Sequence, residues 1–251
     1  MTNDLSPEIL AKEFWSGTGL QEIFPRNIEQ AIAMTLPLAV VKMPSVTTGA
    51  VRKWLKNQHV SASLPEDKRD LMGCLVAYRG HGVVFVCGAD DPSEQRLTVA
   101  HEVGHFLADY RLPRQQVIQA LGERIAEVLD GFRQATPAER ANAVLSHVRL
   151  GAHVHLLPRR GTDEDSDACV GYAEQRAHQL GIELVAPHER IMRLWGKFGT
   201  QGMTNSKEIS SRLAAYFGLP ENAFCRISEK INRRRPASFL QDAISTIKAR
   251  Q

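Results

Sequence analysis

The chain has 251 residues, of which 43% are hydrophobic and 24% are charged, and its formal net charge is +3. This composition is typical of a globular protein with a substantial core, and so small a charge gives no indication of a nucleic-acid partner. The N-terminal residues lack the basic and apolar regions of a secretion signal, no nearby apolar run is long enough to cross a bilayer, and the four scattered cysteines form no C-x-x-C pair. We therefore expect a cytoplasmic protein with reduced thiols and no membrane contact.

The N-terminal part of the chain predicts helices followed by a strand. Residues 7–34 have a helical pattern that glycines and a proline interrupt, and residues 36–41 form a short apolar run typical of a β-strand. Residues 51–57 fit either a helix or a surface lobe. The polar residues 61–70 suit a loop.

A hairpin and a helix come next. Residues 74–78 and 83–86 are strand-like and flank the turn residues Gly80–Gly82. Ser93 is the predicted N-cap of a helix that we expect to end before Pro113.

The centre of this predicted helix carries the sequence H-E-x-x-H, from His101 to His105. Histidines four residues apart share one helical face and can hold one metal ion together. Glu102, one step round the helix, can reach a water on that metal and act as general base. A catalytic zinc ion (Zn²⁺) needs three protein ligands and an open position for water, so a third ligand must come from elsewhere.

Glu174 is the predicted third ligand. It belongs to a predicted helix over residues 171–185, on the same face as Ala177 and Gly181. Two small residues on that face let another helix approach closely, as a carboxylate must to reach a metal held elsewhere. Taken alone, the residues leave a second interpretation open, in which Glu174 near a helix start stabilises the helix dipole.

Other side chains compete for the same role. His153 and His155 would share one face of a strand and could bind metal, although an exposed strand is the commoner origin of such a pair. Asp109 lies one turn beyond His105 and is a candidate ligand or histidine partner. We expect the remaining polar candidates to be solvated or capping residues: Asp163, Glu164, Asp165, Asp167, His178 and His188.

The rest of the chain is predicted to be largely helical. Helices are expected over residues 117–134 and 137–148, with a short apolar stretch between Gly151 and Pro158. Further helices are expected over residues 188–198, 206–217, 221–232 and 239–248.

Within the C-terminal helices, Ile209, Leu213 and Phe217 recur at helical spacing before a turn at Gly218–Pro220, as in a helix-turn-helix. Contact with DNA is one interpretation, supported by the basic residues nearby. The favoured one is a pair of helices that packs on the core and senses a partner. The basic residues are Arg226, Lys230, Arg233, Arg234 and Arg235.

Two stretches resemble one known family. Residues 96–105 are similar to the zinc-helix signature R-x-T-x-A-H-E-x-G-H of the ImmA/IrrE metallopeptidases, and residues 174–187 are similar to that family's second signature, E-x-x-A-x-x-F-A-x-x-L-L-x-P. Leu180 and Gly181 stand where the family has Phe-Ala, and Cys87 stands where a strand often ends in Asn. The segment between the two signatures is longer than usual.

The resemblance implies zinc ligands at His101, His105 and Glu174, with Glu102 as general base. It implies an α+β fold with a minimal zincin-like core, a small mostly antiparallel sheet and two helices, in which the outer strand of the hairpin lies beside the site. We expect this domain over residues 1–187, with an extended helical segment at 111–170. Residues 188–251 would form a C-terminal helical region.

The predicted function is that of an intracellular zinc endopeptidase that cleaves a specific protein. The resemblance implies a helix-turn-helix transcriptional repressor as substrate, in mobile-element control or a stress response. An extended substrate could pair with the strand at residues 83–86 or its neighbour, and Tyr172 or a histidine could stabilise the oxyanion. The alternatives are a zinc-bound module that binds a repressor or DNA without cutting, and a purely structural zinc.

Overall fold

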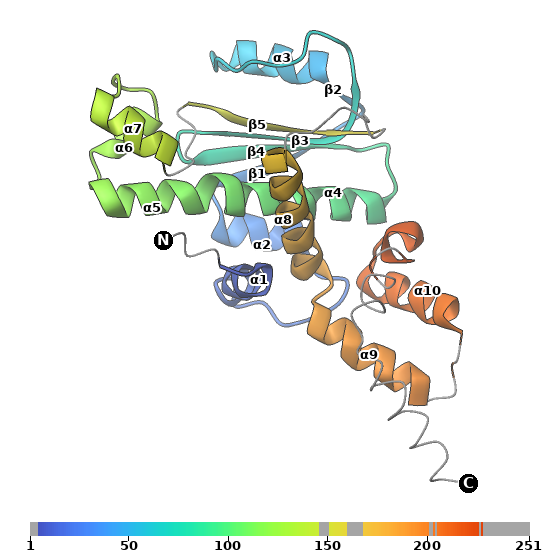
Figure 1. The fold of residues 1–251 in the computed structure, drawn as a ribbon. Coiled ribbons are helices and arrows are strands. Elements are labelled where there is room, and N and C mark those ends of the chain that lie inside the picture. The colour runs from blue at the N-terminus through green and yellow to red at the C-terminus, as the bar shows by residue number, and fades with distance from the viewer. Residues whose placement is uncertain are drawn as a thin grey trace. The chain divides into compact units, whose positions relative to one another are not determined.

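The computed structural model describes residues 5–145, 151–159, 168–200, 203, 205–225 and 227 (Figure 1). The chain forms two compact units, Met1–His188 and Glu189–Gln251. Across the described ranges, no helix combines the length and the apolar character that crossing a bilayer requires.

A mixed sheet of five strands forms the centre of the first unit. β1 (Leu38–Met43) runs parallel to β4 (His81–Cys87), and β4 pairs antiparallel with β3 (Asp70–Tyr78). β5 (His153–Pro158) pairs antiparallel with the other side of β3, whereas the short β2 (Val46–Thr47) pairs antiparallel with residues 70–71 of β3, beyond the end of β4. With helices covering the sheet, this is the α+β fold predicted from the sequence.

The predicted hairpin is confirmed, but its turn is shifted. The turn consists of Arg79 and Gly80, whose φ angles of 52° and 80° suit the two-residue turns that match strand twist. Gly82 belongs to β4 instead, where a Cβ would lie only 2.5 Å from the Leu38 side chain and 2.9 Å from the Phe106 ring. The glycine at this position therefore serves packing rather than the turn.

The helix that carries the candidate metal ligands, α4 (Pro92–His105), begins two residues earlier than expected. Its N-cap is Asp91, not Ser93, because the Asp91 side chain accepts the Ser93 N–H at 3.0 Å. Pro92 takes the first turn, where its missing N–H leaves no bond unmade.

The helix also does not stop before Pro113. A π-helical turn, η1 (Phe106–Arg111), leads directly into α5 (Leu112–Leu121). Pro113 is the second residue of α5 and directly follows the π-helical turn.

The segment between the two family signatures is not wholly helical as predicted. The expected helix at 117–134 is divided at Gly122, whose φ of 84° ends α5, and resumes as α6 (Ile125–Leu129). α7 (Pro137–Leu145) follows. The apolar stretch after Gly151 is then the edge strand β5, which adds to the sheet beside β3.

Helices cover both faces of the sheet (Figure 1). On one face, α2 (Ile28–Thr35) contacts β1 and α4, while α1 (Pro7–Ser16) contacts α8. On the opposite face, α3 (Thr48–Asn57) buries Val51 and Leu55 against apolar side chains of β3 and β4.

α8 (Ala168–Val185) crosses α4 at very short range. A Cβ at Gly104 of α4 would collide with the backbone of Ala177, and a Cβ at Gly181 would lie 2.9 Å from the carbonyl oxygen of Ala100. The prediction that Ala177 and Gly181 admit another helix is thus confirmed. Because α8 begins at Ala168, Glu174 is not in its first turn, and the helix-dipole explanation for this residue loses its basis.

In the second unit, the predicted helix-turn is present. α10 (Ser206–Phe217) ends at Gly218, which has the left-handed φ of 63°, and the Phe217 ring stacks on Phe224 at 6.0 Å. α9 begins at the boundary and spans His188–Thr200. The basic residues of the DNA-binding interpretation, Arg226, Lys230, Arg233, Arg234 and Arg235, lie outside the described residues, as does the helix expected at 239–248.

Candidate metal centre

Helix α4 presents two imidazoles on one face. His101 and His105 lie one helical turn apart, and both are buried, at 7% and 2% exposure. Their Nε2 atoms are 3.2 Å apart, and the ring centroids are separated by 4.8 Å at a steep angle. The two nitrogens therefore converge on one point, as the spacing in the sequence predicts.

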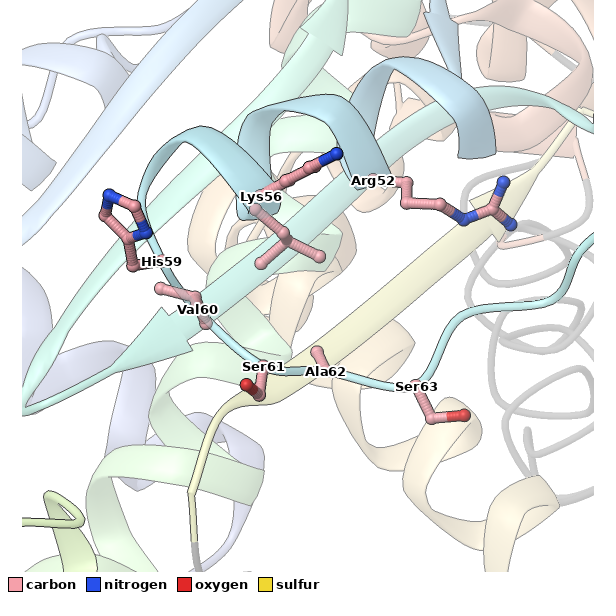
Figure 2. Close-up of a pocket in the computed structure, with 8 residues that line it drawn as sticks. Arg52, Lys56, His59, Val60, Ser61, Ala62 and Ser63 are labelled. Carbon is pink, nitrogen blue, oxygen red and sulfur yellow. The ribbon is translucent and has the colours of Figure 1, made fainter.

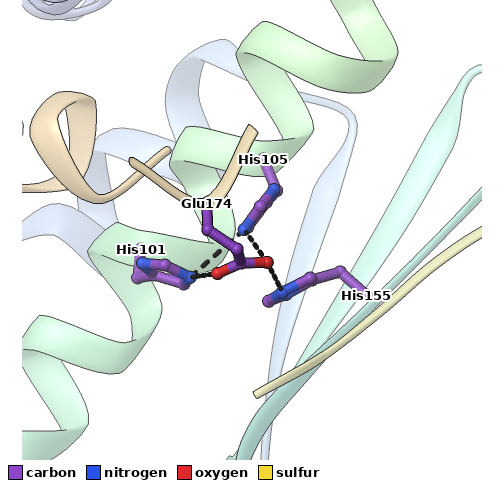
Figure 3. Close-up of side chains that lie close together, drawn as sticks. All are labelled: His101, His105, His155 and Glu174. Carbon is purple, nitrogen blue, oxygen red and sulfur yellow. Dashed lines mark hydrogen bonds and ion pairs between the residues drawn. The ribbon is translucent and has the colours of Figure 1, made fainter. Parts of the chain in front are cut away.

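Glu174 reaches the same point from α8 (Figure 3). Its Oε2 lies 3.4 Å from Nε2 of His101, and its Oε1 lies 3.5 Å from Nε2 of His105. The close crossing of the two helices brings the carboxylate within this reach. The structure thus brings together the three residues that the sequence suggests as ligands.

The spacing of these atoms suits a tetrahedral ion. Ligand atoms bound about 2.0–2.1 Å from a tetrahedral metal are separated from one another by about 3.3–3.4 Å. The 3.2 Å between the Nε2 atoms of His101 and His105 is close to this value, and each of these nitrogens lies 3.4–3.5 Å from one of the two oxygens of Glu174. The three side chains therefore surround one point, at separations that suit a bound metal ion.

His155 is a fourth member of the cluster. Its place there was not predicted from the sequence. The ligand atoms of His101, His105, His155 and Glu174 all lie within 4.8 Å of one another, so this group is placed to bind a metal ion. The sequence favoured an exposed strand for the His153–His155 pair. That is wrong for both residues: His153 is buried, and β5 at the sheet edge turns the His155 ring toward α4 and α8 (Figure 3).

Glu102 lies next to the cluster and is fully buried. Its Oε2 is 2.8 Å from Nδ1 of His155. Its Oε1 faces Gly73 of β3, 3.4 Å from where a Cβ would be, and has no hydrogen-bond partner among the described residues. The lack of a side chain at Gly73 gives this carboxylate its space. A buried carboxylate beside a metal site is the arrangement that a general base needs.

Asp109 forms a hydrogen bond with His105 on the side of the ring that faces away from the cluster. Its Oδ2 accepts a hydrogen bond from Nδ1 of His105 at 2.6 Å, which leaves Nε2 free to face the cluster. Its other oxygen pairs with Arg176 of α8, whose guanidinium also donates to the carbonyl oxygen of Ala108 at 3.1 Å. Of the two roles left open by the sequence, the structure supports that of a histidine partner.

The cluster strongly perturbs its own ionisation. Burial alone would raise the pKa of Glu174, but hydrogen bonds from His101, His105 and His155 hold it far below its ordinary value. Burial would lower the pKa of His155, but the charge of Glu102 and hydrogen bonds to Glu102 and Glu174 raise it to about 10. Glu174 is therefore an ionised carboxylate, the form that binds a metal.

The remaining candidates lie outside this cluster. Tyr172 is exposed and its ring lies near Arg176. The half-buried His178 ring lies 6.2 Å from that of His101. The backbone N–H of His188 donates to the carboxylate of Glu183. The acidic residues Asp163, Glu164, Asp165 and Asp167 lie outside the described residues.

The substrate-pairing prediction also needs correction. Residues 83–86 belong to β4, which is paired on both sides by β1 and β3, and β3 is paired by β4 and β5. Neither strand of the hairpin is therefore the outer strand beside the site. That position is held by β5, which the longer segment between the two signatures supplies.

An open pocket of about 700 Å³ lies elsewhere, beside α3. Arg52, Lys56 and His59 line it together with residues 60–63 (Figure 2). Because α3 covers the face of the sheet opposite α4, we assign this pocket no part in the chemistry of the cluster.

Comparison of the sequence with protein-family models and with curated proteins gives no match. The resemblance to the ImmA/IrrE metallopeptidases therefore depends on the two sequence signatures alone.

Proposed function

We propose that this protein is a zinc-dependent endopeptidase that cuts a specific protein substrate, with Glu102 as general base. The observation that carries the proposal is the convergence of His101, His105 and Glu174 on one point, with Glu102 adjacent to the histidines on helix α4. Two imidazoles and one carboxylate form a donor set typical of catalytic zinc.

Each residue of the site has a task that its surroundings support. His101, His105 and Glu174 would hold the ion, and Asp109 fixes the tautomer of His105. When bound, zinc lowers the pKa of a water to about 7 and polarises a carbonyl group. Glu102, buried and within reach of this point, would take the proton of the attacking water and pass it to the leaving amine.

The substrate is proposed to be an extended protein segment that lies along β5. Among the described strands near the site, β5 is paired on one side only, so its other edge can accept a substrate strand. By the family resemblance, a helix-turn-helix repressor is the proposed substrate.

Replacing Glu102 by Gln tests this proposal. The variant should keep about one zinc ion per chain, because no ligand is lost, yet cleave nothing. New N-termini can be counted by mass spectrometry after incubation with a denatured proteome digest and with candidate repressors. The matched control is Glu123→Gln, an exposed glutamate outside the cluster, which should cleave like the unaltered protein.

Cleavage that persists in Glu102→Gln would contradict the proposed mechanism. Absence of cleavage in every protein, with zinc bound, would instead favour a metal-bound module that regulates a repressor without cutting it. One observation favours that second candidate: His155 lies in the cluster beside the three proposed ligands and fills space that a catalytic site keeps open for water.

A further inference from the structure

His155 spans the space between the general base and the metal ligands. Its Nε2 is 2.7 Å from Oε1 of Glu174, a contact that Figure 3 shows. Its Nδ1 is 2.8 Å from Oε2 of Glu102. A nucleophilic water would have to contact the same two partners, with one side toward the ligands and the other toward Glu102.

Glu102 has no second oxygen to offer that water. Its Oε1 is turned toward Gly73 in the sheet and is completely buried. Only Oε2 faces the cluster, and His155 already occupies it.

His155 is also packed differently from a metal ligand. Two imidazoles on one tetrahedral ion, with bonds of about 2.0 Å, have ring centroids about 5 Å apart. The His101 and His105 rings fit this at 4.8 Å, whereas the His155 ring lies flat against that of His105, at 3.7 Å and 26°. The imidazole is therefore stacked over the ligand set, where it covers the open side.

We propose that His155 holds the centre in a closed resting state, in which its imidazole occupies the place of the nucleophilic water between Glu102 and the metal ligands. A shift of β5 away from α4, such as an extended substrate paired along its outer edge could cause, would open the site. This inference rests on the proposed function, because it assigns a regulatory role to a residue of the same centre.

The test measures access to the metal rather than cleavage alone. The full-length protein is loaded with Co²⁺, and acetohydroxamate, which needs a free coordination position, is titrated while the visible absorption of Co²⁺ is recorded. If the closed state holds roughly 90% of the molecules, His155→Ala should bind acetohydroxamate about tenfold more tightly than the unaltered protein. Co²⁺ content should stay near one per chain, because the three ligands remain.

Val154→Ala is the matched control. Val154 lies on the same strand but packs on the opposite face of the sheet, so its removal loosens β5 without opening the site. It should leave the affinity for acetohydroxamate unchanged. If His155→Ala does not fold, His155→Asn, which is smaller but keeps hydrogen-bonding atoms, takes its place.

Equal or weaker binding of acetohydroxamate after the loss of His155 would overturn the closed state, and so would loss of Co²⁺. The two proposals fail separately. Tighter binding without any proteolysis by His155→Ala would support the closed state and count against the peptidase. Proteolysis with unchanged affinity for acetohydroxamate would support the peptidase and contradict the closed state.

Discussion

At the scale of single residues, Asp109 links the two helices that carry the ligands. It accepts from His105 on α4 and pairs with Arg176 on α8. Carboxylate partners of this kind orient a histidine and increase its basicity, and their loss typically costs about 10- to 100-fold in metal affinity.

Asp109→Asn should therefore lower zinc affinity by about 10- to 100-fold without abolishing binding. Competition with a chelating dye measures the effect. Asp130→Asn is the matched control, since Asp130 also pairs with an arginine, Arg114, but has no contact with the ligands. Equal zinc affinities in the two variants would contradict a role of Asp109 in metal binding.

The sequence predicted part of this cluster because some contacts are local. His101, Glu102 and His105 follow from helical periodicity within five residues. Glu174 needed a second signature, and its place in the cluster depends on a helix crossing. His155 could not be assigned, because its role depends on β5 pairing with β3, which no local pattern encodes.

At the scale of elements, the crossing of α4 and α8 determines whether Glu174 meets the histidines. The backbones touch at Gly104 and at Gly181, so a single added methyl group must push the helices apart. Overpacking of this kind typically costs about 1–3 kcal/mol.

Gly181→Ala should accordingly lower the free energy of unfolding by about 1–3 kcal/mol and weaken zinc binding, because the carboxylate of Glu174 moves away from α4. Gly171→Ala is the control on the same helix. A Cβ there meets nothing within 4 Å, so the change should be neutral or stabilising through helix propensity. Urea unfolding and zinc titration of both variants provide the measurements. If Gly181→Ala behaves like Gly171→Ala, the tight crossing does not position the site.

Elements with strong local signals were predicted well, and those set by tertiary contacts were not. The hairpin and α10 follow from alternation and periodicity. The π-helical turn η1 and the continuation of the helix into α5 could not be predicted, because a proline such as Pro113 favours the end of a helix. The residues of β5 were predicted only as a short apolar stretch, because their strand conformation depends on pairing with β3.

At the scale of the whole molecule, the fold brings together parts of the chain that are far apart in sequence. Helix α4 packs on one face of the sheet, and α8 crosses α4. Strand β5 forms the edge of the sheet next to β3. Composition and the order of predicted elements were enough to indicate an α+β protein. They could not indicate which edge of the sheet faces the site, because the pairing of β5 depends on the complete sheet.

The central claim is that one metal ion is held between α4 and α8 by His101, His105 and Glu174. Anomalous X-ray diffraction from zinc-loaded crystals, recorded on both sides of the zinc absorption edge, tests it most directly. We expect one peak per chain, about 2.0–2.2 Å from Nε2 of both histidines and from a carboxylate oxygen of Glu174. A peak elsewhere, or one without Glu174 in contact, would contradict the account.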